Sequence, residues 1–371
     1  MSILFHILSF LGIFVVMVRG SSTSSSSSSS PSVVVTGINE RTDHDGVVRR
    51  TAVVRVRIYL VRHGESASNK WGLIAGQDDV PLTTNGIEEA KNLGRKSLYL
   101  QNNSVPFLRV YSSDLSRARD TAIYALTEGR KVQRTQRQNQ SDRQREDESQ
   151  AGSGNDIDIE NDIRSQLIQD KRLRERSYGY RQGFPRIMND DEIQDIWKQY
   201  GIEPPLYETD EDLWIRGKDW LVDVLQQLQT MIQVEKQFFH TSANDQDDQD
   251  NGNPPRPEAS REEEQLSSST TTTYHVLAVA HSGLIREIIL HLIPSKEELI
   301  AMDAKFDTKK GKSKLIIPNT SVTILEFELD HGGDNKNRNE NESSTSSLLK
   351  HVKLIELTNA KHLDTVNAYD D

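Results

Sequence analysis

Histidine and arginine residues stand at or soon after the ends of three short apolar segments of this 371-residue chain. The segment "IYLV" is followed by Arg62–Gly64 (Arg-His-Gly), and "HVLAVA" is followed by His281–Gly283 (His-Ser-Gly). A third segment, "RVYSS", leads into a stretch that carries Arg117. A guanidinium group binds two phosphate oxygens at once, and histidine can transfer a proton or act as a nucleophile. These residue types together predict a site for a phosphate group.

The elements that must position these residues alternate along the chain between strands and helices. Apolar segments predict strands over 53–61, 107–113 and 274–280, and helical periodicity predicts helices over 83–100, 114–126, 210–239 and 284–293. In a parallel sheet the carboxyl ends of the strands share one edge, where ligands bind beside helix N-termini with free N–H groups. We therefore expect four side chains to form one cationic pocket at that edge: Arg62, His63, Arg117 and His281.

The alternation predicts an α/β fold, a three-layer α/β/α sandwich with a mostly parallel central sheet. Two late apolar segments, 321–329 and 348–357, are expected to pair as strands. Polar tracts near 130–160, 240–273 and 330–347 show no helical or strand period, and we interpret them as low-complexity insertions. One domain is therefore expected over 52–365, preceded by a Ser-rich linker over 21–51.

The N-terminal segment predicts entry into the secretory pathway. An apolar run over 3–18 is followed by Arg19 and Gly20 before a serine tract, as in a signal peptide that is cleaved after residue 20. The run is shorter than the roughly 20 residues of a spanning helix. A secreted or secretory-pathway protein is the expected outcome. The alternatives are an uncleaved membrane anchor, the one case with a membrane partner, and a bipartite organellar targeting sequence.

Composition excludes several classes of function. The net charge of −11 argues against nucleic acid as a partner, because binding to the phosphate backbone needs a basic surface. The chain has no cysteine, so disulfides, thiolate nucleophiles and thiolate-bound metals are excluded. A small phosphorylated substrate remains compatible with this charge, because a few local arginines can outweigh a diffuse acidic surface.

Five ordered motifs resemble the histidine phosphatase superfamily, in the branch that contains the cofactor-dependent phosphoglycerate mutases and the fructose-2,6-bisphosphatases. The motifs are "RHGE" at 62–65 with Asn69 after it, "GQDDVPLTTNGIEEA" at 76–90, "SSDLSRARDTA" at 112–122, "LRERSYGYRQG" at 173–183 and "VAHSGLIR" at 279–286. They span nearly all the chain outside the leader and the polar tracts. The resemblance implies a phosphoglycerate mutase-like fold and a phosphatase.

The resemblance also implies a role for each site residue. His63 would attack phosphorus and form a phosphohistidine, and Glu175 would protonate the leaving oxygen and then activate water. The remaining residues would bind the phosphate oxygens: Arg62, Asn69, Arg117, His281 and Ser282. Cationic side chains would then stabilise the transferring group, so neither a metal ion nor a cofactor is expected.

Departures from the pattern bear on the substrate. Ser177 stands where the mutases have a histidine, and Lys198-Gln199 stands where they have two arginines, which favours hydrolysis over phosphoryl transfer between sugar acids. Ser282 replaces the glycine that usually follows the second histidine. The segment "PPLYETDEDLWIRGKDWL" at 204–221 resembles the fructose-2,6-bisphosphatase-like members, which suggests a sugar phosphate. The alternatives are a phosphoglycerate-type mutase and a non-catalytic module that binds a phosphorylated ligand.

Overall fold

In the computed structural model, strand β3 (Val54–Arg62) lies inside a six-stranded sheet with the order β10-β9-β3-β6-β4-β5. Strands β6 (Thr272–Ala280), β4 (Arg109–Ser112) and β5 (Leu167–Gln169) run parallel to β3. Strand β9 (Val322–Leu329) runs antiparallel between β3 and β10 (Val352–Asn359). The sheet is therefore mostly parallel, and the two late strands pair as predicted.

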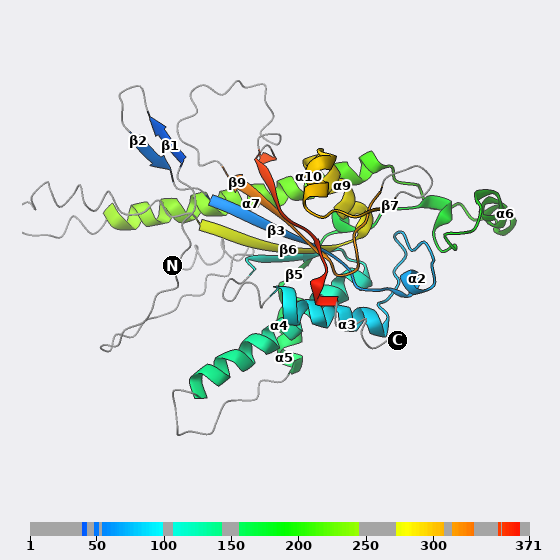
Figure 1. Ribbon diagram of the computed structural model, residues 1–371, viewed down its shortest axis with the longest axis horizontal. Coiled ribbons are helices and arrows are strands. Elements are labelled where there is room, and N and C mark those ends of the chain that lie inside the picture. The colour runs from blue at the N-terminus through cyan, green and yellow to red at the C-terminus, as the bar shows by residue number, and fades with distance from the viewer. Residues whose placement is uncertain are drawn as a thin grey trace, which may run out of the picture. The chain divides into compact units, whose positions relative to one another are not determined.

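Helices cover both faces of this sheet (Figure 1). Helices α7 (Asp210–Asn244) and α9 (Ser282–Leu292) cover one face, and their core residues include Trp220, Leu221 and Ile285. Helices α3 (Thr84–Leu93), α4 (Ser116–Asp142) and α5 (Asp156–Gln166) cover the other. Alternate side chains of β3 enter the two cores, Ile58 on one face and Tyr59 on the other. The three-layer α/β/α sandwich predicted from the sequence is confirmed.

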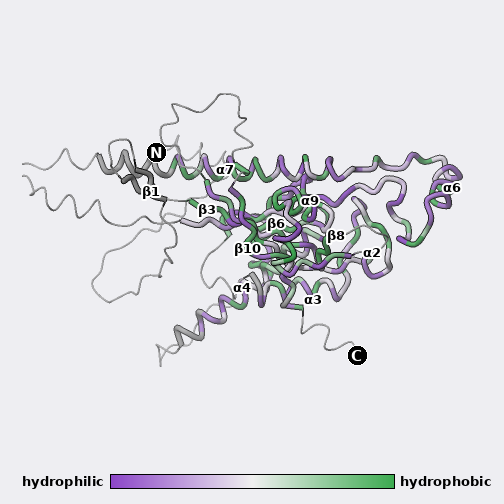
Figure 2. Tube along the Cα trace, turned by 45° about the horizontal axis from the view of Figure 1, so that its top comes forward, coloured by the Kyte–Doolittle hydropathy of each residue, from purple (hydrophilic) through white to green (hydrophobic). Residues whose placement is uncertain are grey.

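Apolar side chains explain why the layers form where they do. Figure 2 shows that hydrophobic segments concentrate where helices meet the sheet, whereas α4 is mostly hydrophilic beyond it. The helices also begin at suitable caps: the Thr83 hydroxyl accepts from Gly86 N–H at the start of α3, and Asn189 caps Glu192 N–H at the start of α6 (Asp190–Tyr200).

Shorter elements complete the described part of the chain. They are β1 (Asn39–Thr42), β2 (Val48–Thr51), α2 (Ala67–Lys70), η1 (Gly94–Leu98), η2 (Lys171–Leu173), η3 (Gly179–Arg181), α10 (Lys296–Ala301), β7 (Phe306–Asp307), β8 (Lys314–Leu315) and η6 (Lys361–Leu363). Strands β1 and β2 form an antiparallel hairpin within the segment predicted as a linker.

The structure describes residues 39–42, 48–51, 54–98, 107–142, 156–244, 272–307, 314–329, 348–349 and 351–363. All of them belong to the unit Gly37–Asp371. The predicted signal peptide and the polar tract at 330–347 lie outside the described residues, so both stay predictions. Among the described helices, none combines the length and the hydropathy that a membrane crossing requires.

Helices extend into the edges of two of the polar tracts. Helix α4 continues to Asp142 and α5 begins at Asp156, so both ends of the tract near 130–160 are helical. Helix α7 likewise continues to Asn244. The α4 extension is rich in Arg, Gln and Lys, which favour helix even where no apolar stripe marks the period.

Candidate active site

The two motif histidines follow neighbouring parallel strands, and the register brings them together. Arg62 at the end of β3 is paired with Ala280 at the end of β6, and His63 N–H donates to Ala280 C=O at 3.0 Å. Strand β4 ends beside β6, where Ser113 N–H donates to Val279 C=O at 2.9 Å. The segment after β4 opens α4, which carries Arg117. The three strand ends therefore converge at one edge, as predicted.

His63 and His281 face one another inside the protein. Their ring centroids are 5.0 Å apart, the planes are tilted by 57°, and the residues are 4% and 0% exposed. His63 Nδ1 lies 2.6 Å from Gly64 C=O, which can only accept, so Nδ1 carries the proton and donates it. The lone pair of the neutral ring is then on Nε2, where a nucleophile is needed.

Burial keeps both imidazoles neutral. Burial is the largest cause that lowers the pKa of His63 well below 6.5, followed by the charges of Arg117 and Arg62, while the bond to Gly64 C=O opposes the shift. The pKa of His281 is also lowered well below 6.5, first by burial and then by Arg117. A neutral His63 is the form that can attack phosphorus.

The two arginines are held by backbone carbonyl groups. Arg117 donates from Nη1 to Asp78 C=O at 2.8 Å and from Nη2 to Gly76 C=O at 2.7 Å. Arg62 Nη1 donates to Ile317 C=O at 2.6 Å, and burial lowers the pKa of Arg62 to about 10. Carbonyl oxygens fix a guanidinium group without neutralising it. Both side chains therefore stay cationic near neutral pH.

Buried donors at this edge point to an oxyanion as the ligand. Neither ring nitrogen of His281 nor Arg62 Nε has a hydrogen-bond partner among the described residues, although all three atoms are buried. Leaving a buried polar group unpaired costs about 1–3 kcal/mol. A neutral imidazole has one N–H, so His281 offers one donor beside Arg62 Nε, and the non-bridging oxygens of a phosphate are suitable partners for both donors.

Glu175 is held at the N-terminus of α9. Gly283 N–H lies 3.1 and 3.2 Å from its two carboxylate oxygens, and the Ser282 hydroxyl donates to Oε2 at 3.2 Å. Arg176 N–H donates to Oε1 at 2.8 Å. The close approach needs a glycine, because a Cβ on residue 283 would lie 2.1 Å from Glu175 Oε1. Ser282 thus contacts the candidate acid directly.

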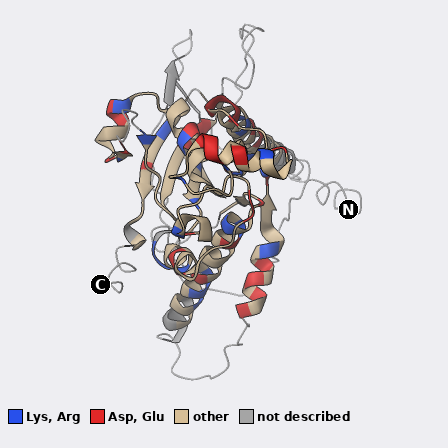
Figure 3. Cartoon of the chain, turned by 90° about the vertical axis from the view of Figure 1, so that its right-hand side faces the viewer, with Lys and Arg blue, Asp and Glu red and all other residues tan. Residues whose placement is uncertain are grey.

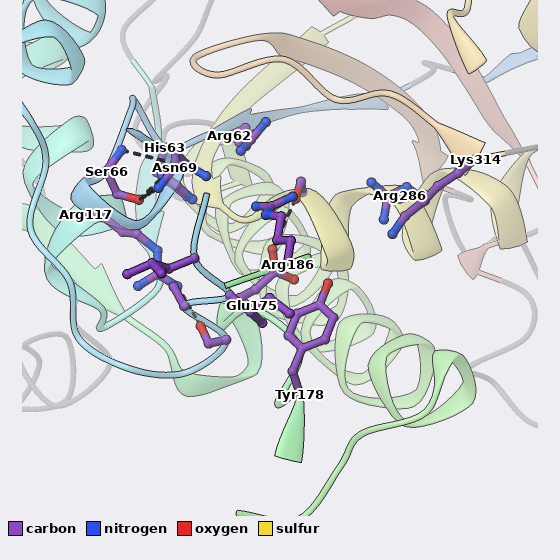
Figure 4. A pocket seen from close by; sticks show the side chains of 15 residues that line it. Arg62, His63, Ser66, Asn69, Arg117, Glu175, Tyr178, Arg186, Arg286 and Lys314 are labelled. Carbon is purple, nitrogen blue, oxygen red and sulfur yellow. Dashed lines mark hydrogen bonds between the residues drawn. The ribbon is translucent and has the colours of Figure 1, made fainter. Parts of the chain in front are cut away.

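These side chains border a cavity of about 220 Å³, shown in Figure 4. Six of the seven predicted site residues line it: Arg62, His63, Asn69, Arg117, Glu175 and Ser282. His281 is not among the lining residues and packs its ring against His63. Asn69 Oδ1 accepts from the Ser66 backbone N–H and hydroxyl in a capping box, which leaves the amide N–H groups of Asn69 as its donors.

A second group of cations, which was not predicted from the sequence, lines the same cavity and consists of Arg186, Arg286 and Lys314. We call these three residues the distal cationic cluster. Burial lowers the pKa values of Arg286 and Lys314, and the charge of Arg286 is the second cause for Lys314. No ion pair to a carboxylate is found for any of the three within the described part of the chain. The charge of Glu175 raises the pKa values of Arg286 and Lys314, but burial outweighs it, so these crowded cations still favour an anion.

Hydrogen bonds and short strand segments hold the residues of the distal cationic cluster in place. Arg286 Nε donates to Leu315 C=O at 2.8 Å, and the neighbouring Lys314 lies in β8. Arg186 is held by a short antiparallel bridge between Leu73 and Pro185, and its N–H donates to Gly72 C=O at 3.0 Å. Arg286 could have been recognised from the sequence, because it lies one helical turn after Ser282 on α9.

Tyr178 also lines the cavity and was not singled out from the sequence. Burial raises its pKa to about 12, and the charge of Glu175 adds to the shift. Its hydroxyl therefore stays protonated and can donate a hydrogen bond to a ligand.

The described residues include no group of three His, Cys, Asp or Glu side chains that could hold a metal ion. Among the described residues that line the cavity, Glu175 is the one carboxylate. The first turns of α6 and α7 are acidic, and Figure 3 shows Asp and Glu spread over several helices with Lys and Arg among them.

Several known proteins resemble this chain in sequence. Residues 58–144 match the family model of the histidine phosphatase superfamily (branch 1). Fructose-2,6-bisphosphatase TIGAR of Xenopus tropicalis is 33% identical over 174 residues, which cover 45% of this chain and 49% of that protein. The protein of the same name from Bos taurus is 25% identical over 294 residues, which cover 76% of this chain and 92% of that protein.

The match to the Xenopus protein thus spans about half of its length. Among solved structures, a phosphoserine phosphatase mutant of Entamoeba histolytica in complex with phosphoserine is 17% identical. That comparison has a TM-score of 0.41 and covers 83% of this chain and 99% of the other.

Proposed function

Because the chain belongs to the histidine phosphatase superfamily, we propose that it is a metal-independent phosphomonoester hydrolase that acts through a phosphohistidine on His63. The observation that carries this proposal is the pairing of a neutral, buried His63 with buried donors on His281 and Arg62 that have no partner. Such a pairing supplies a nucleophile and the groups that bind the oxygens of the atom it attacks.

In the first step, Nε2 of His63 attacks phosphorus in line with the leaving oxygen. The N–P bond forms while the P–O bond to the leaving group breaks, and Glu175 donates a proton to the departing oxygen. In the second step, Glu175 takes a proton from water, the water oxygen bonds to phosphorus, and the N–P bond breaks. Inorganic phosphate leaves, and both residues return to their starting forms.

Fixed cations stabilise the charge on the transferring group. Arg62 and Arg117 are already oriented by carbonyl oxygens, so little reorganisation is needed when the charge on the phosphoryl oxygens changes. His281 and the amide of Asn69 add neutral donors. Interactions of this kind supply most of the catalysis in phosphoryl transfer, which involves little other covalent chemistry.

The distal cationic cluster supports a finer proposal about the substrate, a small phosphorylated metabolite such as a sugar phosphate that carries a second anionic group. Arg286 and Lys314 lie together on the opposite side of the cavity from His63 and Arg117 in Figure 4. The cavity volume of about 220 Å³ suits a small molecule rather than a protein segment. A substrate with one phosphate at His63 and a second anion at Arg286 would satisfy both groups.

The proposal is tested by the hydrolysis of an aryl phosphate by the purified chain in excess EDTA. Wild type and a control variant, His351→Ala, should release phosphate at the same rate, because His351 is exposed. His63→Ala should be inactive. Equal turnover by His63→Ala and wild type would refute the role of His63. Activity that requires a bisphosphate primer and moves the phosphoryl group to another acceptor would indicate a mutase, and tight phosphate binding without turnover would indicate a binding module.

A further inference from the structure

Thr320 has an unusual backbone conformation next to the candidate nucleophile. Its φ angle is 49°, in the left-handed region, and the residue is fully buried. This conformation is unfavourable for a β-branched residue. The surrounding structure must therefore hold Thr320 in place.

A histidine from the far C-terminal end of the described chain provides this support. The Thr320 hydroxyl donates to Asn319 C=O at 2.9 Å and lies 2.8 Å from His362 Nε2. The direction of this second bond depends on the tautomer of the His362 ring, and in either tautomer the bond ties the ring to Thr320. His362 is 2% exposed and lies in η6, which packs against α3. The bond is therefore buried and geometrically defined.

The loop that contains Thr320 contacts Arg62 and His63 directly. Ile317 C=O accepts from the Arg62 guanidinium at 2.6 Å, and Ser321 C=O accepts from Arg62 N–H at 3.2 Å. Thr320 N–H donates to His63 C=O at 3.4 Å. A change in the backbone of this loop would therefore move both the cation and the nucleophile of the site.

We propose that His362 is a positioning residue for the active site: its hydrogen bond holds Thr320 in the left-handed conformation, and the loop over 317–321 thereby fixes Arg62 and His63. His362 does not touch the reacting atoms. His362 acts on the site through the backbone of Thr320. Its effect on activity should therefore disappear when residue 320 can adopt the left-handed conformation without a penalty.

The test compares variants of the full-length chain. His362→Leu removes the hydrogen-bonding ring at similar volume, and His362→Gln keeps an amide that can donate or accept. Thr320→Gly adopts a positive φ without the side-chain penalty. We expect H362L to lower kcat for an aryl phosphate by about 10- to 100-fold, which corresponds to the loss of one buried hydrogen bond. H362Q should retain most of kcat, and T320G should stay within about threefold of wild type.

The double variant T320G/H362L tests whether His362 acts through the backbone of Thr320. Its kcat should equal that of T320G, because glycine no longer needs the hydrogen bond. A further loss as large as that of H362L in the wild-type background would overturn the proposal, as would an H362L enzyme with unchanged kcat. If H362L fails to fold, the proposal requires that T320G/H362L folds, and unfolding in both backgrounds would overturn it.

The kinetic readout rests on the proposed function, so a second readout is independent of turnover. Amide hydrogen exchange in the segment 316–322 should be faster in H362L than in wild type, and T320G/H362L should match T320G. The exposed residue His351 supplies the control variant, His351→Ala. A wild type that hydrolyses no phosphate ester but shows this exchange pattern would refute the proposed function and leave the role of His362 standing.

Discussion

The rings of His63 and His281 lie 5.0 Å apart at the ends of two adjacent parallel strands, and both are buried beside the guanidinium groups of Arg62 and Arg117. Four basic side chains in one place would repel each other if all were charged. Burial resolves this because it keeps the two imidazoles neutral while the guanidinium groups remain cationic. The site thus combines a free nucleophilic nitrogen with fixed positive charge.

This arrangement predicts how activity depends on pH. The pKa of His63 is lowered below 6.5, so the nucleophile stays deprotonated as the pH falls through 6.5. We therefore expect that protonation of His63 does not yet lower kcat/KM as the pH falls through 6.5. In Arg117→Met the largest charge that lowers this pKa is lost, so the acid limb should move to higher pH. A wild-type profile that peaks only in alkaline solution, or an acid limb that Arg117→Met leaves in place, would contradict this account.

Glu175 is expected to matter most when the leaving group is poor. General acid catalysis contributes about 10²- to 10⁴-fold. Glu175→Gln should therefore reduce kcat/KM for alkyl phosphates by about that factor and for nitrophenyl phosphate much less, since a nitrophenolate leaves without protonation. The matched control is Ser282→Ala, which removes one donor to the carboxylate and keeps the acid. An equal loss on both substrates would argue against the role of Glu175 as an acid.

The distal cationic cluster should affect only substrates with a second anion. Arg286→Gln and Lys314→Gln should each raise KM for a sugar bisphosphate by about tenfold, as expected for a lost charge-assisted hydrogen bond. Neither should change KM for an aryl monophosphate by more than about twofold on the same physical grounds. Lys198→Gln, on the exposed face of α6, serves as a control. Equal effects on both substrates would place these residues in general phosphate binding instead.

His275 predicts a pH dependence of stability that is separate from catalysis. Its Nδ1 lies 2.9 Å from the Tyr59 hydroxyl, and burial, followed by the charge of Arg57, lowers its pKa from 6.5 to about 4. Between these values the unfolded chain binds a proton that the folded protein does not. The stability that neutral His275 contributes is therefore present above pH 6.5 and is lost as the pH falls toward 4.

Urea unfolding at pH 7 and pH 4.5 measures this effect. The loss of unfolding free energy between the two pH values should be smaller in His275→Gln than in wild type by about 1–2 kcal/mol. His351→Ala, which removes an exposed histidine, should behave like wild type. The same loss in His275→Gln and wild type would show that His275 does not titrate as described.

The sequence predicted that Arg62, His63 and His281 would come together, because each of them stands at the end of an apolar strand. Arg62, His63 and His281 follow apolar runs directly, so the parallel sheet alone brings them together. The distal cationic cluster was missed for a physical reason. Lys314 and Arg186 lie on short segments with no period, and their convergence depends on a β-bridge and on the path of the chain into β8.

The fold was predicted to a similar degree. Long amphipathic helices and apolar strands were identified, including the paired strands β9 and β10. Strand β5 was not, because its three residues carry too little pattern, although they pair with β4 at the edge of the sheet. Helix α6 and the extension of α4 were missed because their polar faces dominate the sequence.

The central claim, a phosphoryl group held covalently on His63, can be tested by trapping the intermediate. The purified chain is mixed with an aryl phosphate in EDTA, quenched rapidly in alkali, where phosphohistidine survives, and digested for mass spectrometry. We predict a phosphorylated peptide with the modification on His63, absent in His63→Ala and increased in Glu175→Gln if hydrolysis of the intermediate becomes limiting. Turnover in wild type with no phosphoryl group on His63 at any quench time, together with an active His63→Ala, would contradict the account.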